Sequence, residues 1–276
     1  MPELPEVEVI CRGLRPHLLD RTVTAIHHSG KQLRRPVPID SFCREMVGRR
    51  ITAVTRRAKY LQISMDSGAM LILHLGMTGN LGFFSPRSEP AKHDHVRWTL
   101  DNDTELRYND SRRFGSLQIL ASGETNDLEE TVFKTTGPEP FHDAFSPEYL
   151  HRLAKGKELA VKVFIMNTRV VAGVGNIYAS ESLFRAGILP TKKVQTISKK
   201  DWGRLITAIR EILQQAIDCG GSTISNFINA RQEKGYFQVN FKVYGRRGEP
   251  CPNCQEKIEK IRLGGRASYF CPMCQK

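Results

Sequence analysis

Four cysteines near the end of the chain restrict its fold more tightly than any other feature. They form two Cys-x-x-Cys pairs, Cys251 with Cys254 and Cys271 with Cys274, separated by residues 255–270. Each pair places two thiolates on one tight turn, and two such turns supply a tetrahedral Zn²⁺ site. Because the protein provides all four ligands, the pattern predicts one structural zinc ion. A redox pair or two disulfides would be the alternative, and this spacing in a cytosolic chain disfavours both.

The segment that contains these cysteines is strongly basic. Residues 241–276 hold eight Lys and Arg against three Glu. Arg266 follows Gly264 and Gly265, and a turn pinned by metal would hold its guanidinium group against a phosphate. Zinc ribbons also bind proteins, so the ribbon alone leaves both DNA and protein as partners.

The whole chain carries an excess of positive charge. Its 276 residues include 41 Lys and Arg and 29 Asp and Glu, a net charge of +12, which favours a polyanion such as nucleic acid. The sequence has no apolar run of membrane-spanning length, no basic amphipathic helix and no signal-peptide pattern. We therefore expect a cytoplasmic protein without membrane contact. Cys11, Cys43 and Cys219 are expected to be free, mostly buried thiols.

The chain begins with the sequence MPELPE. Methionine is normally removed before a small residue, so we expect Pro2 as the mature N-terminus, with an amine whose unperturbed pKa is about 8. Such an amine would attack a carbonyl-like carbon and form a cationic iminium, with Glu3 and Glu6 as acid/base groups within reach. The alternative is an ordinary helix start, because acidic residues are common in first turns.

Regular structure is predicted along most of the chain. An opening helix follows from Pro5, which suits the first helical position, and from the apolar spacing of Val7, Ile10, Leu14 and Leu18. Short alternating or β-branched segments predict an antiparallel sandwich or barrel. They are residues 22–26, 51–55, 61–65, 70–75, 96–100, 105–108 and 117–120.

The second half of the chain is predicted to be helical, after an acidic segment. Residues 121–145 are acidic and contain two prolines, and we expect a hinge there. Helices are predicted from Ser146 to Lys155 and from Ser198 to a stop at residues 220–221.

Two glycine-flanked turns carry large side chains. Met77 lies in HLGMTG, and Arg112 and Phe114 lie on a probable hairpin tip in DSRRFG. Apolar side chains inserted between base steps kink a duplex, and an Arg could fill the gap left by an extruded base. For each residue taken separately, a position in the core is the alternative.

Three further sites could contact a nucleic-acid backbone. Lys59 could clamp a phosphate, serve as an acid/base group, or be an ordinary surface lysine. His93 lies in KHDHV, where phosphate contact or local turn structure is favoured over metal binding. Asn176 follows a glycine turn and opens a helix whose N–H groups suit a phosphate.

Together these segments resemble the formamidopyrimidine-DNA glycosylase family of bacteria, from residue 2 to the last cysteine pair. No motif is decisive alone, but their order is highly specific. The motifs are PELPEVE (2–8), RRAKYL (56–61), HLGMTG (74–79), KHDHV (92–96), RRFG (112–115), GPEP (137–140), VGNIYASESLF (174–184), GGST (220–223) and VYGRRGEPC (243–251).

The resemblance implies an α+β fold. A helix and an antiparallel β-sandwich (1–135) would precede a helix-two-turn-helix domain (136–240) and a zinc-finger β-hairpin (241–276). It implies a monomeric DNA repair enzyme with one structural Zn²⁺. The enzyme would remove oxidised purines, 8-oxoguanine and formamidopyrimidines, from double-stranded DNA in base-excision repair. It would then nick the abasic site by β,δ-elimination.

The resemblance also implies roles for single residues. Pro2 would be the Schiff-base nucleophile and Glu3 the general acid/base, with Glu6 ordering the site. Lys59 would assist β-elimination and Arg266 δ-elimination. The gap left by the extruded nucleotide would be filled by Met77, Arg112 and Phe114. The DNA backbone would be contacted by His74, His93, Lys157 and Asn176. Residues 222–237 would contain the loop over the extruded base.

Two other functions compete with this one. An endonuclease VIII-type enzyme for oxidised pyrimidines shares the fold, but Leu4 replaces the Gly of those relatives. A non-catalytic damage-binding protein would keep the ribbon and the basic groove. Two departures from the family leave local geometry open: Asn167 where Asp is usual, and Ser111 in place of a frequent Pro.

Overall fold

The structure is a computed structural model that describes residues 2–221 and 241–276. The chain divides into two compact units. One comprises Met1–Lys134 with Cys219–Tyr236, and the other Thr135–Asp218 with Phe237–Lys276. The boundary after Lys134 falls within the acidic, proline-containing segment 121–145.

Helix α1 (Leu4–Leu18) opens the first unit. It begins one residue earlier than predicted, so Pro5 is its second residue, where the missing N–H would have had no intrahelical partner. The predicted apolar face is fully buried, at Val7, Ile10, Leu14 and Leu18. The face therefore fixes how α1 packs. Cys11 is buried on it as well, and Cys43 and Cys219 are half-buried; all three are free thiols, as predicted.

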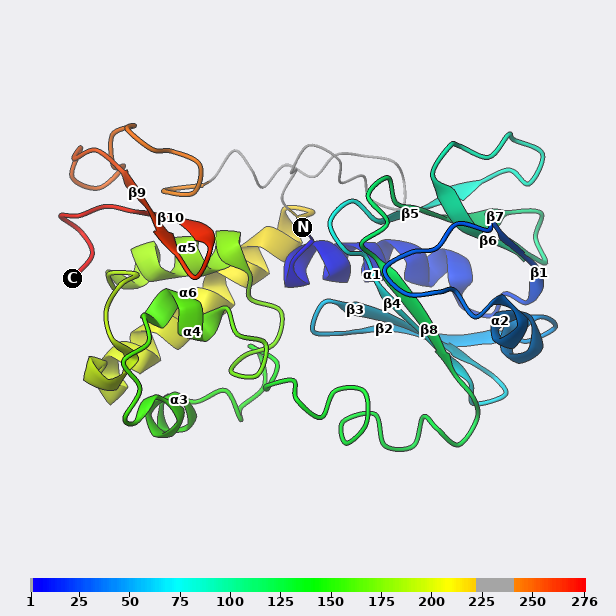
Figure 1. Cartoon of the computed structure of the whole chain (residues 1–276), viewed down its shortest axis with the longest axis horizontal. Helices are drawn as coiled ribbons and strands as arrows, with labels where there is room; N and C mark the ends of the chain where they lie inside the picture. The colour runs from blue at the N-terminus through cyan, green and yellow to red at the C-terminus, as the bar shows by residue number, and fades with distance from the viewer. Residues whose placement is uncertain (1, 222–240) are drawn as a thin grey trace. The chain divides into compact units, whose positions relative to one another are not determined.

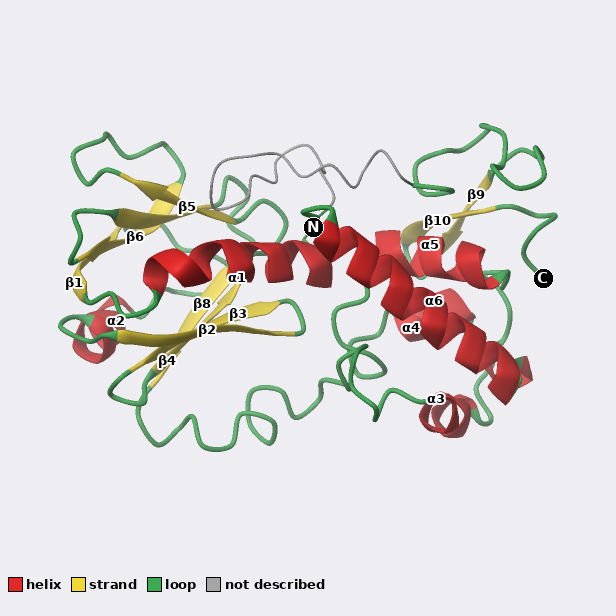
Figure 2. Ribbon diagram, turned by 180° about the vertical axis from the view of Figure 1, so that it is seen from behind, coloured by secondary structure: helices red, strands yellow, loops and turns green. Residues whose placement is uncertain are grey.

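Two four-stranded antiparallel sheets form a sandwich in this unit (Figures 1 and 2). Their strand orders are β1-β6-β7-β5 and β2-β3-β4-β8. Helix α1 shares one apolar core with strands of both sheets. The strands are β1 (Val23–His28), β2 (Ile51–Arg57), β3 (Tyr60–Met65), β4 (Met70–His74), β5 (Asn80–Phe84), β6 (Asp94–Leu100), β7 (Glu105–Asn109) and β8 (Ser116–Leu120).

Two elements of this unit were not predicted. Strand β5 contains Gly82 and lacks an alternating pattern, yet it pairs along its length with β7. Helix α2 (Ile39–Met46) is short and buries only Phe42 and Met46. Both depend on partners that are distant in the sequence, so local patterns do not reveal them.

The second unit is mainly helical. Its helices are α3 (Pro147–Ala154), α4 (Val161–Ile165), α5 (Asn176–Ala186) and α6 (Lys199–Asp218), with a 3₁₀ turn η1 (Val194–Thr196). The predicted start of α3 is confirmed, because the Ser146 hydroxyl accepts a hydrogen bond from the Tyr149 N–H at 3.2 Å. The predicted end of α6 is confirmed too, since Gly220 and Gly221 follow it with φ values of 78° and 83°.

A two-stranded hairpin, β9 (Glu259–Leu263) and β10 (Arg266–Phe270), completes the second unit. Glu181 of α5 fixes the segment leading to it, accepting backbone N–H bonds of 2.9, 3.0 and 2.8 Å from residues 242–244. Burial raises the pKa of Glu181, and these three bonds oppose that shift. No helix in the described part of the chain is long and apolar enough to cross a membrane.

Candidate active site

Two buried carboxylates organise the start of the chain. Glu3 precedes α1 as its N-cap, and only 3% of Glu3 and 3% of Glu6 are exposed. The Glu3 backbone N–H donates to Glu6 Oε2 at 2.7 Å, within a capping box. The helix start is therefore capped, and the capping places an acid in a fixed position directly after Pro2.

The GGST motif begins beside this helix start. A Cβ built on Gly221 would be 3.5 Å from both Cα and Cγ of Glu6. Gly221 has a φ of 83°, which favours glycine. The loop predicted to cover an extruded base, residues 222–237, lies outside the described residues.

Lys59 and His74 are brought together by strand pairing. Lys59 lies in the tight turn between β2 and β3, after Ala58 with a φ of 54°. The next residue, Tyr60, is paired with His74 of β4, and their ring centroids are 4.9 Å apart. Burial, and to a smaller extent the positive charges of Lys59 and Arg34, together lower the pKa of His74 to about 4.

This environment also determines the tautomer of His74. Its ring is neutral at pH 7, and Nδ1 accepts a hydrogen bond from the Gly76 N–H at 3.1 Å. The single ring proton must therefore lie on Nε2. A neutral His74 can donate one hydrogen bond from Nε2, as contact with a phosphate oxygen requires.

The three residues predicted to fill a gap in the duplex do not turn into the core. Met77 is 38% exposed and Phe114 46% exposed. The guanidinium carbon of Arg112 lies 4.7 Å from the centroid of the Phe114 ring. All three line one pocket of about 700 Å³, together with His74 and Arg34 among others.

The topology explains why these residues meet. Strand β4 pairs with β8, and β5 pairs with β7. Residues 75–79 lead from β4 to β5 and residues 110–115 from β7 to β8, so both turns cross from one sheet to the other. They must run side by side. The predicted hairpin tip for Arg112 and Phe114 was therefore wrong, because β7 and β8 belong to different sheets.

In the KHDHV segment Lys92 is exposed and His93 is half-buried, whereas the last three side chains are buried. His95 is buried and hydrogen-bonded, with Nδ1 3.1 Å from the Ser29 hydroxyl and Nε2 2.9 Å from the Asp110 carbonyl oxygen. Asp94 is buried as well, and His93 is half-buried in the turn before β6. His93 is therefore accessible to a ligand, as is the exposed Lys92.

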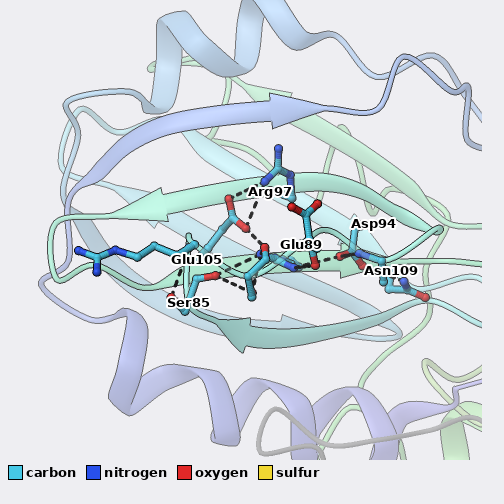
Figure 3. A network of polar contacts seen from close by, with 10 residues as sticks. Ser85, Glu89, Asp94, Arg97, Glu105 and Asn109 are labelled. Carbon is cyan, nitrogen blue, oxygen red and sulfur yellow. Dashed lines mark hydrogen bonds and ion pairs between the residues drawn. The ribbon is translucent and has the colours of Figure 1, made fainter.

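A buried polar network holds this turn (Figure 3). Arg107, 2% exposed, pairs with Glu105 at 2.6 Å and with Asp94 at 3.5 Å. Asp94 also accepts from Asn109 Nδ2 at 2.8 Å and from the Ala91 N–H at 2.8 Å. Because each buried charge has several partners, the network ties the turn before β6 firmly to β7.

In the second unit, a buried lysine connects Asn176 with the hairpin. Lys162 is 1% exposed, and its Nζ donates to Asn176 Oδ1 at 2.7 Å, to the Ala267 carbonyl at 2.8 Å and to the Ser268 hydroxyl at 2.8 Å. Asn176 opens α5 as predicted. The sequence analysis missed Lys162, although a lysine inside the apolar stretch AVKVFI was a usable signal.

Arg266 and Lys157 are both exposed in this unit. Arg266 opens β10 after Gly264 and Gly265, whose φ values are 52° and 75°. It directly precedes the two residues held by Lys162. Lys157 lies elsewhere, with Nζ 5.7 Å from the Phe164 ring centroid, and its contact with DNA stays a prediction.

The four cysteines meet as predicted. Their Sγ atoms all lie within 4.8 Å of one another. Cys251 and Cys274 are 3.8 Å apart, and Cys254 and Cys271 are 3.4 Å apart. Tetrahedral Zn²⁺ with Zn–S bonds near 2.3 Å requires sulfur separations of about 3.8 Å. The cluster fits one zinc ion, which is structural because all four positions are taken by protein.

Comparison with known proteins places this geometry in a family. Family models for the formamidopyrimidine-DNA glycosylase N-terminal domain, its H2TH domain and the zinc finger found in FPG and IleRS match residues 1–117, 136–228 and 248–276. The formamidopyrimidine-DNA glycosylase of Vibrio vulnificus is 45% identical over 275 residues, with both chains fully covered. This chain belongs to the formamidopyrimidine-DNA glycosylase family. The Methylococcus capsulatus member is 46% identical over 276 residues, again with full coverage of both.

Solved structures of family members have the same fold. A Lactococcus lactis FPG variant in complex with DNA containing Fapy-dG superimposes with a TM-score of 0.91 at 32% identity, covering 100% of each chain. The Lactococcus lactis enzyme with abasic-site DNA gives a TM-score of 0.90 at 32% identity and 99% coverage of each. A further Lactococcus lactis complex contains an oxidised pyrimidine, with a TM-score of 0.90, 32% identity and full coverage of both chains.

The two departures from the family motifs are accommodated locally. The Asn167 side-chain oxygen accepts a hydrogen bond from the Arg169 N–H at 3.0 Å, which an Asp could also accept. Ser111 is exposed in the turn that carries Arg112. Both residues leave the backbone of their turns hydrogen-bonded.

Proposed function

We propose that this chain is a bifunctional DNA glycosylase and abasic-site lyase of base-excision repair. Its substrate is double-stranded DNA that contains 8-oxoguanine or a formamidopyrimidine. The observation that carries the proposal is the start of α1, where Pro2 directly precedes Glu3, the buried N-cap of the helix. Relatives named formamidopyrimidine-DNA glycosylase, and solved complexes of family members with Fapy-dG or abasic-site DNA, support the proposal.

The chemistry begins at the amine of Pro2. Its lone pair attacks C1′ of the damaged nucleotide, and the glycosidic bond breaks with its electron pair leaving on the base. Glu3 supplies and accepts the protons, so that the sugar ring opens and a cationic iminium joins C1′ to the Pro2 nitrogen.

The same iminium drives strand cleavage. It acidifies the C2′ proton, and loss of this proton expels the 3′ phosphate with the electron pair of its C–O bond. We assign assistance of this β-elimination to Lys59 and assistance of the later loss of the 5′ phosphate to Arg266. Hydrolysis of the iminium then returns free Pro2. One nucleophile therefore serves both the glycosylase and the lyase steps.

DNA must be opened before this chemistry can start. A base within the stack cannot be reached, and extruding its nucleotide costs a few kcal/mol. Met77, Arg112 and Phe114 fill the vacated space in this proposal. His74, His93, Asn176 and Lys157 bind phosphates, His74 through its Nε2–H.

We assign these roles to three domains of one monomer. Residues 1–135 carry the nucleophile and the wedge, residues 136–240 contribute Asn176, and residues 241–276 present Arg266. We also propose a cytoplasmic location, because the proposed substrate is DNA and the relatives are bacterial proteins.

Borohydride trapping tests the nucleophile. Reduction during incubation with duplex containing 8-oxoguanine opposite cytosine should leave a covalent adduct, and peptide mapping should place it on Pro2. A matched protein that retains Met1 has an amide in place of the amine and should give no adduct. Tight binding without any adduct from the mature protein would favour a damage-binding protein. Faster turnover of oxidised pyrimidines than of 8-oxoguanine would favour the endonuclease VIII-type alternative.

A further inference from the structure

We propose that Asp110 and Thr78 form a clamp that joins the two turns bearing Met77, Arg112 and Phe114 into one rigid wedge. Neither clamp residue is proposed to touch the reacting atoms. They are positioning residues that act through the three wedge side chains. This inference rests on the proposed function, because it assigns a cause to the efficiency of nucleotide extrusion.

The Asp110 carboxylate is the centre of the clamp. Asp110 is fully buried. Its Oδ1 accepts from the Thr78 hydroxyl at 2.5 Å, and its Oδ2 accepts from the Gly115 N–H at 2.8 Å and the Tyr108 hydroxyl at 3.1 Å. One side chain therefore holds the turn of Met77 and the far end of the turn of Phe114.

The Thr78 hydroxyl closes the link in the other direction. It accepts a hydrogen bond from the Arg112 N–H at 3.1 Å while donating to Asp110. A hydroxyl can donate one hydrogen bond and also accept through its lone pairs. The single Thr78 hydroxyl therefore satisfies both the Asp110 carboxylate and the Arg112 N–H. The backbone of Arg112 is thereby tied to the residue next to Met77.

The backbone of Asp110 extends the clamp to a third turn. Its N–H donates to the His93 carbonyl at 3.1 Å, and its carbonyl accepts from the Arg113 N–H at 3.2 Å. Arg113 has a φ of 56°, a strained value for a residue with a side chain. These hydrogen bonds keep Arg113 in its strained conformation and fix His93 relative to the wedge.

Three glycines let the turns close on one another. A Cβ on Gly76 would lie 2.4 Å from the Gly115 nitrogen. A Cβ on Gly79 would lie 2.7 Å, and one on Gly115 1.7 Å, from the Tyr108 hydroxyl oxygen. The turns therefore touch backbone to backbone at Gly76 and Gly115, and Gly79 and Gly115 leave room for the Tyr108 hydroxyl. Such packing leaves little freedom for either turn to move alone.

Rigidity matters because the wedge side chains are exposed. Met77 and Phe114 have no core to hold them in free protein. If the two turns moved independently, DNA binding would have to order them, and this ordering costs free energy. Less of the binding free energy would then remain to offset the cost of base extrusion. A clamp formed during folding removes this cost from the binding step.

A matched pair of substitutions tests the clamp. Thr78→Val keeps the shape of the side chain and removes the hydroxyl, whereas Thr78→Ser keeps the hydroxyl. We expect Thr78→Val to slow single-turnover excision of 8-oxoguanine opposite cytosine by about 10-fold or more, at saturating protein. Thr78→Ser should stay within about threefold of wild type. Thr24→Val, which removes a hydroxyl bonded to the Thr99 carbonyl at 3.2 Å on β1, is the control for generic loss of a threonine hydroxyl.

A second substrate separates positioning from general damage to the fold. When the lesion lies opposite an abasic gap, no base pair has to be broken, so Thr78→Val should excise it at close to the wild-type rate. 2-Aminopurine beside a paired lesion should report slower unstacking with Thr78→Val. Equal losses on paired and unpaired lesions, or an undiminished rate on the paired one, would overturn the clamp. Failure of the wild-type protein to release either base would instead refute the proposed function.

Discussion

At the scale of single residues, hydrogen bonding and position distinguish two acids that are equally buried. Glu3 and Glu6 are both 3% exposed at the start of α1, but their surroundings assign them different work. Glu6 accepts the backbone N–H of Glu3, which supports a structural task for Glu6. Glu3 directly follows Pro2, the proposed nucleophile, so we propose that Glu3 transfers the protons.

Matched amide substitutions should separate the two acids. Gln retains an oxygen that accepts a hydrogen bond but cannot exchange protons. We therefore expect Glu3→Gln to lower 8-oxoguanine excision by about 10²–10⁴-fold, and Glu6→Gln to lower it by less than about 10-fold. Single-turnover assays on one duplex measure both, with thermal melting to verify folding. Equal losses in the two variants would contradict this division of roles.

His74 should make stability depend on pH. Its pKa is about 4 when folded and about 6.5 when unfolded. Between these two pH values His74 is protonated in the unfolded chain but neutral in the folded protein. The contribution of His74 to folding stability is therefore complete above pH 6.5 and is lost as the pH falls toward 4. The loss is at most ~1.4 kcal/mol per pH unit. Urea unfolding at several pH values should show a shallower dependence for His74→Gln, and parallel curves would refute the burial argument.

At the scale of elements, short segments are stabilised by contacts with other elements. The hairpin β9–β10 has only two strands, which is marginal on its own. It is held by the four cysteines, by Glu181 at its approach and by Lys162 beneath Ala267 and Ser268. Its turn can therefore present Arg266 in a defined direction.

Removal of zinc should release this hairpin. Four sulfur atoms within 4.8 Å of one another would repel as thiolates without the cation. We expect chelation to abolish binding to lesion-containing duplex, and added Zn²⁺ to restore it. Fluorescence anisotropy measures binding, and a colorimetric metal assay should count one Zn²⁺ per chain. Full affinity in a verified metal-free sample would contradict the structural role.

At the scale of the whole molecule, the proposed site residues are divided between two units of a chain with a net positive charge. The first unit carries Pro2, Glu3 and Lys59, and the second carries Asn176 and Arg266. The excess of +12 charges favours association with any duplex, whereas in the proposed function lesion recognition depends on the wedge and the nucleophile.

Salt dependence should count the phosphate contacts. Each neutralised phosphate contributes about 0.9 to the slope of log K against log salt concentration. Arg266→Gln should therefore reduce the slope by about 1 on a duplex with a non-cleavable abasic analogue. Arg204, paired with Asp201 at 2.7 Å, supplies the control, since Arg204→Gln should leave the slope unchanged. An unaltered slope for Arg266→Gln would remove Arg266 from the phosphate contacts.

Local signals in the sequence were sufficient for much of the fold and part of the site. The apolar spacing of α1, the cap of α3 and the glycines after α6 all act within a few residues, so pattern reading located them. The cysteine pairs located the metal cluster for the same reason. Strand β5 and helix α2 were missed because only distant partners stabilise them.

The sequence by itself determined which residues could serve as nucleophile, acid and zinc ligands, because these properties belong to the residues and their spacing. Only the tertiary structure decided that residues 75–79 and 110–115 both cross between sheets and close around Asp110. It also decided that Lys162 holds Asn176 and the hairpin. The physical reason is that strand pairing and burial join positions far apart in the chain, which no local pattern records.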